Sequence, residues 1–156
     1  MGTTFAMREF DINTGLATPG YLIAMGSREL SFAQETGYPL SVLTVSFNAE
    51  SRHRGFDEKS SPGLVKTIGE KIAKLTGDGS MVSHIGNGEF TVLLPGTPAS
   101  KAEEIGRIVT KELNGSGNII GSLHLNAYYG IASSDNPVSG FSDLISRSIR
   151  SIVQSR

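Results

Sequence analysis

Apolar positions along the chain follow two different spacings. In four stretches they recur every three or four residues, which is typical of helices with one buried face. In four others β-branched and aromatic residues gather in short runs, which favours β-strands. The predicted helices begin at Pro19, Pro62, Pro98 and Phe141. The predicted strands cover 40–47, 81–85, 90–94 and 123–132.

The order of these elements predicts the fold class. The chain reads helix, strand, helix, hairpin, helix, strand, helix, and from the first strand onward this is a β-α-β-β-α-β core. That arrangement is the ferredoxin-like or palm fold of the α+β class, with a mainly antiparallel sheet and flanking helices, and we expect the helices of this core on one side of the sheet. We see no internal repeat and no long linker, so we expect residues 1–10 to be an N-terminal extension and 11–156 to form one domain.

The hairpin carries the clearest local signal. Gly86-Asn87-Gly88 separates two strand-like runs, and an Asn-Gly pair in that position is typical of a tight β-turn. Glycine also lets a phosphate approach backbone N–H groups, so the same segment could serve as an anion-binding hairpin. We favour the ordinary turn. Glu89 and Phe90 follow it, and we favour Glu89 as a solvent-side strand residue over a functional acid.

Composition narrows the function classes. The 14 Lys and Arg residues against 15 Asp and Glu give a net charge of -1, which argues against a nucleic-acid-binding surface. The absence of cysteine excludes disulfides, thiol catalysis and Cys-based metal sites. The three histidines share no metal-ligand spacing. No apolar run is long enough for membrane insertion, so we expect a soluble, cytoplasmic domain.

Several segments, in this order, resemble the GGDEF domain of bacterial diguanylate cyclases. They are Asp11-x-x-Thr14-Gly15-Leu16, strand 40–47, the hairpin 86–90 with Thr91-Val92-Leu93-Leu94-Pro95 after it, and Gly130-Ile131-Ala132. The likeness covers about residues 11 to 156. It implies a reaction in which two GTP molecules are joined into cyclic di-GMP. It also implies divalent ions, held by two carboxylates, that bind the triphosphate and help to activate the attacking hydroxyl.

The residues that the resemblance assigns to this chemistry differ from the family pattern. Ser46 stands where the family has its first metal-binding Asp, and Gly88 stands where it has the second acid. Neither residue offers a carboxylate. Glu89 is kept, but neighbouring side chains on a strand point to opposite faces, so we expect it to point away from the side that position 88 would use. The resemblance therefore implies that the metal site is lost.

Guanine recognition differs as well. Arg54 and Gly63 align with the family's Asn and Asp that contact the base. An Arg cannot accept hydrogen bonds from the guanine N1–H and 2-amino groups as a carboxylate does. Gly77-Asp78-Gly79-Ser80 replaces the Arg-x-x-Asp of the product-inhibition site, and Arg156 falls near a phosphate-contacting Lys of the family.

These differences lead to one main hypothesis and two alternatives. We expect a catalytically inactive, degenerate GGDEF domain, without metal or other cofactor, that acts as a regulatory or protein-interaction module through a protein partner or self-association. A divergent nucleotide-binding domain or weakly active cyclase, using GTP and Mg²⁺ through Glu89 and the backbone near Asn48, is the first alternative. A purely structural dimerisation module is the second. The residues that could still contact a nucleotide or a partner are Asn48, Arg52, Arg54 and Arg156.

Overall fold

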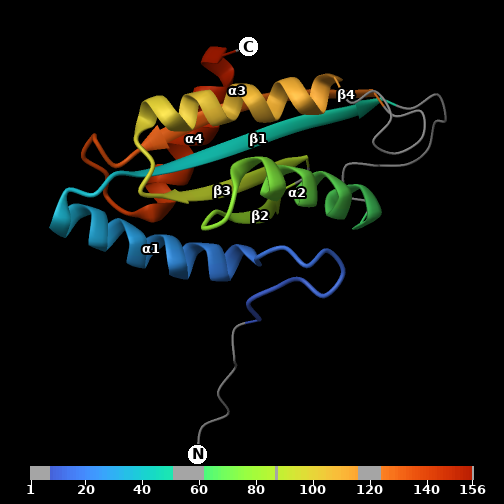
Figure 1. Ribbon diagram of the computed structural model, residues 1–156. Helices are drawn as coiled ribbons and strands as arrows, with labels where there is room; N and C mark the ends of the chain where they lie inside the picture. Colours follow the sequence, from blue (N-terminus) through green and yellow to red (C-terminus); the bar gives the residue numbers. More distant parts are fainter. Residues whose placement is uncertain (1–7, 51–61, 87, 116–123, 156) are drawn as a thin grey trace, which may run out of the picture.

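The computed structural model describes residues 8–50, 62–86, 88–115 and 124–155. Within them the chain forms four helices and four strands (Figure 1). The helices are α1 (Pro19–Thr36), α2 (Pro62–Thr76), α3 (Ala99–Gly115) and α4 (Phe141–Ser155). The strands are β1 (Leu40–Glu50), β2 (Met81–Gly86), β3 (Glu89–Pro95) and β4 (His124–Ser133). Every predicted helix and strand is present.

The strands form one sheet in the order β2-β3-β1-β4, and every pair is antiparallel. β1 and β3 are central, and β2 and β4 lie at the edges. The two βαβ halves of the chain interlock, because β3 and β4 both pair with β1. This is the ferredoxin-like α+β arrangement that the element order predicts.

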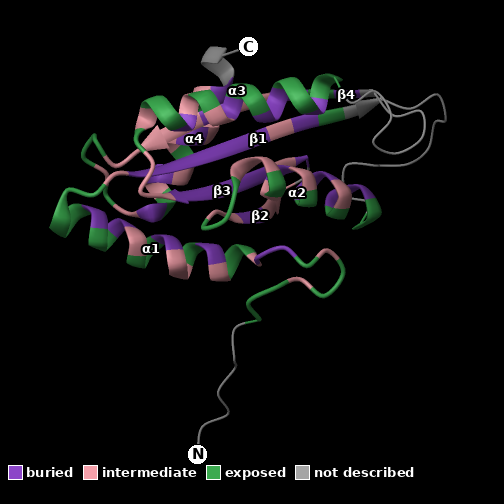
Figure 2. Cartoon of the chain, viewed as in Figure 1, coloured by how far each residue is buried: buried purple, intermediate pink, exposed green. Residues whose placement is uncertain are grey.

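The two helices of the predicted β-α-β-β-α-β core lie on one face of the sheet, as expected, and the two helices that flank this core in the chain cover the other face. Helices α2 and α3 pack on one face, where β1 contributes Leu43 and Val45 to the core. Helices α1 and α4 pack on the other, where β1 contributes Leu40 and Val42. Figure 2 shows β1 buried along most of its length between these layers. A strand that is apolar on both faces needs cover on both.

Helix α1 has the boundaries that its sequence predicts. The Thr18 hydroxyl accepts a hydrogen bond from the Tyr21 backbone N–H at 3.2 Å, and Pro19 occupies the first helical position, where its missing N–H costs nothing. At the other end Gly37 adopts a left-handed conformation with φ 74°, and its N–H donates to the Ala33 carbonyl. These caps fix the helix that leads into β1.

Buried hydroxyl groups join the centre of the sheet to α4. The Thr44 hydroxyl lies 2.7 Å from the Ser148 hydroxyl and 3.2 Å from that of Thr91, and all three residues are fully buried. Ser148 in turn donates to the Ile145 carbonyl. Next to this cluster β4 has Gly130, where a Cβ atom would collide with the α4 backbone. The last helix therefore lies in direct contact with the strands.

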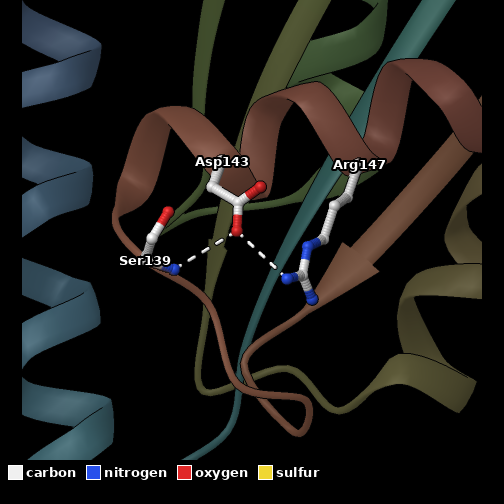
Figure 3. A network of polar contacts seen from close by, with 3 residues as sticks. All are labelled: Ser139, Asp143 and Arg147. Atoms are coloured by element: carbon white, nitrogen blue, oxygen red, sulfur yellow. Dashed lines mark hydrogen bonds and ion pairs between the residues drawn. The ribbon is translucent and has the colours of Figure 1, made fainter.

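The turn before α4 is held by a single carboxylate. Asp143 accepts a hydrogen bond from the Ser139 backbone N–H at 3.2 Å and forms an ion pair with Arg147 at 3.1 Å (Figure 3). The hydrogen bond from Ser139, together with the positive charge of Arg147, holds the pKa of Asp143 below its ordinary value. An acid in the first turn and a base one turn later are each favourable for a helix.

Among the described helices, none is long and apolar enough to cross a membrane.

Candidate functional site

The candidate site lies where the hairpin meets the second half of β1. Ser46 of β1 pairs with Glu89 of β3 on one side and with Tyr128 of β4 on the other, and Glu89 also pairs with Gly86 of β2. Residues directly opposite one another in an antiparallel sheet point to the same face. These four positions therefore form one row across the sheet, which we call the hairpin row. Ser46, Glu89 and Tyr128 are each half-buried.

Pairing between β1 and β3 shows which face of the sheet the Glu89 side chain occupies, which alternation along β3 alone does not. Its side chain lies on the same face as Ser46, the position that the resemblance assigns to the first metal ligand. It also reaches back over Gly86, since a Cβ atom built there would lie 3.5 Å from a Glu89 carboxylate oxygen. The hairpin row thus contains one carboxylate, that of Glu89, and two hydroxyls, those of Ser46 and Tyr128.

The hairpin itself is the tight connection that the sequence predicts. β2 ends at Gly86 and β3 begins at Glu89, so only positions 87 and 88 join them. Gly88 has φ 76°, and its carbonyl accepts a hydrogen bond from the Phe47 N–H at 2.8 Å. A register shift between His84 and Gly86 marks a bulge just before the turn. The observed positive φ is the property of a tight turn that calls for glycine.

Aromatic side chains support the hairpin from the opposite face. The Phe90 ring stacks on Phe47 with ring centres 5.8 Å apart, and His84 lies against Phe90 at 5.2 Å. Phe47 and Phe90 are both almost completely buried. Because these rings come from β1, β2 and β3, they hold the three strands together directly behind the hairpin row.

The other residues that the sequence singles out are not all gathered here. Asn48 is exposed and pairs with Asn126 of β4, two residues along β1 from Ser46. Gly63 is exposed in the first turn of α2. Asn87, Arg52, Arg54 and Arg156 lie outside the described residues. Within the residues that the structure covers, no group of three or more acidic or histidine side chains is placed to hold a metal ion.

A small cavity beside the hairpin, lined by both polar and apolar side chains, is a feature that the sequence does not predict. A space of about 60 Å³ lies between the segment 11–19 and His84. Asp11 accepts hydrogen bonds from the backbone N–H groups of Asn13 and Thr14, which hold its pKa below the ordinary value. His84 Nε2 is buried and has no hydrogen-bond partner within the described residues. The fold brings the two together by pairing Ala17 with Ser83 of β2.

Burial lowers the pKa of His84, and the negative charge of Asp11 offsets this only in part. The unfolded chain then binds a proton more readily than the folded chain. The contribution of His84 to stability is therefore complete above its ordinary pKa of 6.5 and is lost as the pH falls toward the folded value. We expect the free energy of unfolding to decrease between about pH 7.5 and 5.5, measured by urea denaturation.

The matched variant for this measurement is His84→Gln. It keeps the other two histidines of the chain, so the difference between the two pH profiles isolates residue 84. We expect a flatter profile for the variant in this range. Equal slopes would show that the neutral form of His84 does not contribute to stability.

No family model and no curated protein matches the sequence, but solved structures match its fold. The GGDEF domain of FimX from Pseudomonas aeruginosa superimposes with a TM-score of 0.77 at 15% identity, covering 95% of this chain and 93% of that one. DgcB from Caulobacter crescentus, a coiled coil and GGDEF domain solved with c-di-GMP, gives 0.75 at 13% identity over 94% and 80%.

A third likeness is to the active GGEEF domain of a diguanylate cyclase from Vibrio cholerae. The TM-score is 0.68 at 16% identity, with 89% of this chain and 90% of that chain covered. Superposition at identities this low shows a shared fold, and the activity must be argued from the individual residues. The structural likeness confirms the resemblance seen in the sequence: the chain has the fold of the GGDEF domains of diguanylate cyclases.

Proposed function

We propose that this chain is a GGDEF-fold domain of bacterial cyclic di-GMP-type signalling that does not synthesise the dinucleotide and acts in the cytoplasm through contacts with proteins. The observation that supports the proposal best is the chemistry of the hairpin row. Ser46 and Gly88 hold the two positions assigned to metal ligands, and within the described residues Glu89 is the carboxylate that pairs across the strands with Ser46.

This donor set does not fit the metal site that the reaction requires. Magnesium prefers oxygen ligands, and protein sites usually supply one or two carboxylates to each ion in addition to the substrate phosphates. Phosphoryl transfer depends mainly on positioning and charge neutralisation, so a site that lacks two ligands loses most of its catalytic power. A hydroxyl, a glycine and one glutamate are too few for two ions.

The two positions that the resemblance assigns to guanine recognition also support a loss of cyclase activity. Gly63 has no side chain with which to contact the base, and Arg54 provides only hydrogen-bond donors. A domain that keeps this fold but has lost the cyclase activity still has surfaces that can bind regulatory proteins. SiaD from Pseudomonas aeruginosa, another diguanylate cyclase of this fold, was solved in complex with its activator SiaC, at 15% identity to this chain.

A second candidate, a divergent nucleotide-binding domain, is favoured by one observation. Glu89 and Ser46 lie opposite each other on the same face, so a single ion could be held there by one carboxylate, a hydroxyl and water. Such a site would bind a nucleotide without the second ion that turnover requires. Glu89 is the residue on which this candidate depends.

The test combines calorimetric titration with GTP, with and without Mg²⁺, and an assay for cyclic di-GMP after prolonged incubation. We expect no product and no saturable heat, because the two metal ligands are missing. Saturable binding that Glu89→Ala abolishes would favour the second candidate. Robust synthesis of cyclic di-GMP would overturn the proposal.

The variant Ser46→Asp with Gly88→Asp serves as the matched gain-of-ligand control. It supplies a carboxylate at each of the two positions that the resemblance assigns to metal ligands, so we expect Mg²⁺ to bind more tightly than to the natural chain, without efficient turnover. The left-handed conformation at position 88, φ 76°, costs a non-glycine residue about 1–2 kcal/mol, which Asp tolerates better than most. The variant must therefore be shown to be folded before it is titrated.

A further inference from the structure

Large apolar side chains that remain exposed are concentrated before β1. Within the described residues they are Phe10, Ile12, Ile23, Phe32, Tyr38 and, in α3 alone, Ile108. Scattered single residues of this kind are normal, whereas a contiguous patch can mark an interaction surface, and Phe32 belongs to such a patch on α1. Figure 2 shows exposed and half-buried positions along the length of α1, which lies at the outside of the molecule.

One side of α1 carries a continuous stripe beside its buried face. The helix buries Leu22, Gly26, Leu30 and Ala33 against the sheet and α4. The neighbouring stripe contains Tyr21, Met25, Arg28, Phe32 and Thr36, spaced three or four residues apart, with Glu29 between it and the core. Met25, Arg28, Glu29 and Phe32 line an open groove of about 290 Å³.

Two copies of this stripe are complementary when the second copy of α1 runs antiparallel to the first. If a second copy of α1 lies antiparallel, with a two-fold axis between Arg28 and Glu29, each Arg28 faces Glu29 of the partner subunit. Met25 then faces Phe32 of the partner subunit, one turn away on either side. A two-fold interface requires this property, because the same surface must match itself. Opposite charges at the centre and apolar groups on both flanks satisfy it.

The charges at the centre are available for such a contact. Arg28 is exposed and Glu29 is half-buried, and within the described residues neither has an ion-pair partner in its own chain. The Phe32 side chain is about half exposed and touches only the edge of the Tyr38 ring among aromatic neighbours. Pairing would therefore bury apolar surface and neutralise both charges without breaking an existing ion pair.

We propose that the α1 stripe pairs with the same stripe of a second copy, so that the domain forms an antiparallel, two-fold dimer through α1. The inference gives the proposed function a self-association surface and rests on that function for its biological meaning. One helix of 18 residues is about 27 Å long. A single helix pair lies at the small end of protein interfaces, so the dimer is weak and reversible.

The experiment is sedimentation equilibrium of the full 156-residue chain, without nucleotide, at protein concentrations up to about 1 mM. We expect a monomer–dimer equilibrium. Arg28→Glu places Glu against Glu at the centre, and Glu29→Arg places Arg against Arg, so each variant alone should dimerise about tenfold more weakly. An equimolar mixture of the two variants should recover dimerisation, because each Glu then faces an Arg of the other chain.

The mixture separates pairing from a loss of folding, since neither damaged variant could be repaired by adding the other. Lys66→Glu is the matched control: it reverses an exposed charge on α2 that has no ion pair within the described residues, and it should leave dimerisation unchanged. A chain that stays monomeric throughout, or single variants that dimerise normally, or a mixture that does not recover, would each overturn the inference. None of these results depends on nucleotide binding or synthesis, so a failed dimer and a failed function remain distinguishable.

Discussion

Replacing Gly130 with alanine is expected to destabilise the domain by about 3 kcal/mol or more, the upper range of overpacking effects. The added Cβ atom would collide with the backbone carbonyl of Ser148 and lie 2.7 Å from the Ile152 nitrogen. These are backbone atoms of α4, so no rotation of a side chain can relieve the contact. The helix must move away from β4, which also strains the hydrogen bond between Ser148 and Thr44.

The measurement is the free energy of unfolding from urea denaturation, compared with the natural chain. Gly140→Ala is the matched control, because a Cβ atom there meets nothing within 4 Å and the residue precedes the same helix. We expect the control to change stability by less than about 1 kcal/mol. A Gly130→Ala protein as stable as the control would show that α4 is not seated as closely on β4 as described.

Phe90→Ala is expected to cost about 3–5 kcal/mol, the usual range for removing a buried aromatic ring. Phe90 is fully buried, stacks on Phe47 and touches His84, so its loss leaves a cavity shared by three strands. Since domains of this kind are stable by only about 5–15 kcal/mol, a large part of the total would be lost. Thermal and urea denaturation measure the effect.

Phe32→Ala is the matched control for this substitution. It removes the same ring from a position that is 51% exposed, and at dilute concentration we expect a change of less than about 1 kcal/mol. The two variants therefore separate the cost of an internal cavity from the effect of deleting a phenylalanine. Similar losses in both would contradict the placement of Phe90 in the core.

The local elements could be predicted from the sequence because their signals are local. Pro19 and Gly37 mark the two ends of α1, and the strand spacing around Asn87-Gly88 fixes the hairpin within a residue. β1 extends to Glu50, three residues beyond the strand 40–47 that the sequence predicts. Its outer end, beyond Phe47, is a strand because it pairs with β4, and a partner distant in the sequence leaves no local pattern.

The side of the sheet on which α1 and α4 pack cannot be read from the sequence for a different reason. Thr44 and Ser46 are polar residues on one face of β1, yet Thr44 is completely buried beneath α4. Its hydroxyl is satisfied by Thr91 and Ser148, and a buried hydroxyl with partners costs little. The same limit applies to the site. The sequence locates Ser46 and Glu89, but only strand register shows that they face each other.

The position of β1 at the centre of the sheet has a consequence for the order in which the chain assembles. β1 is made early, yet its neighbours β3 and β4 come much later, and the Leu40 N–H finds its partner, Ser134, 94 residues further along. Until β4 has been synthesised, this apolar strand has at least one unpaired edge, and its face beneath α4 is not fully covered. Contacts so distant in sequence slow folding and prolong exposure to aggregation. The sheet can therefore be completed only after β4, the last of its strands, has been synthesised.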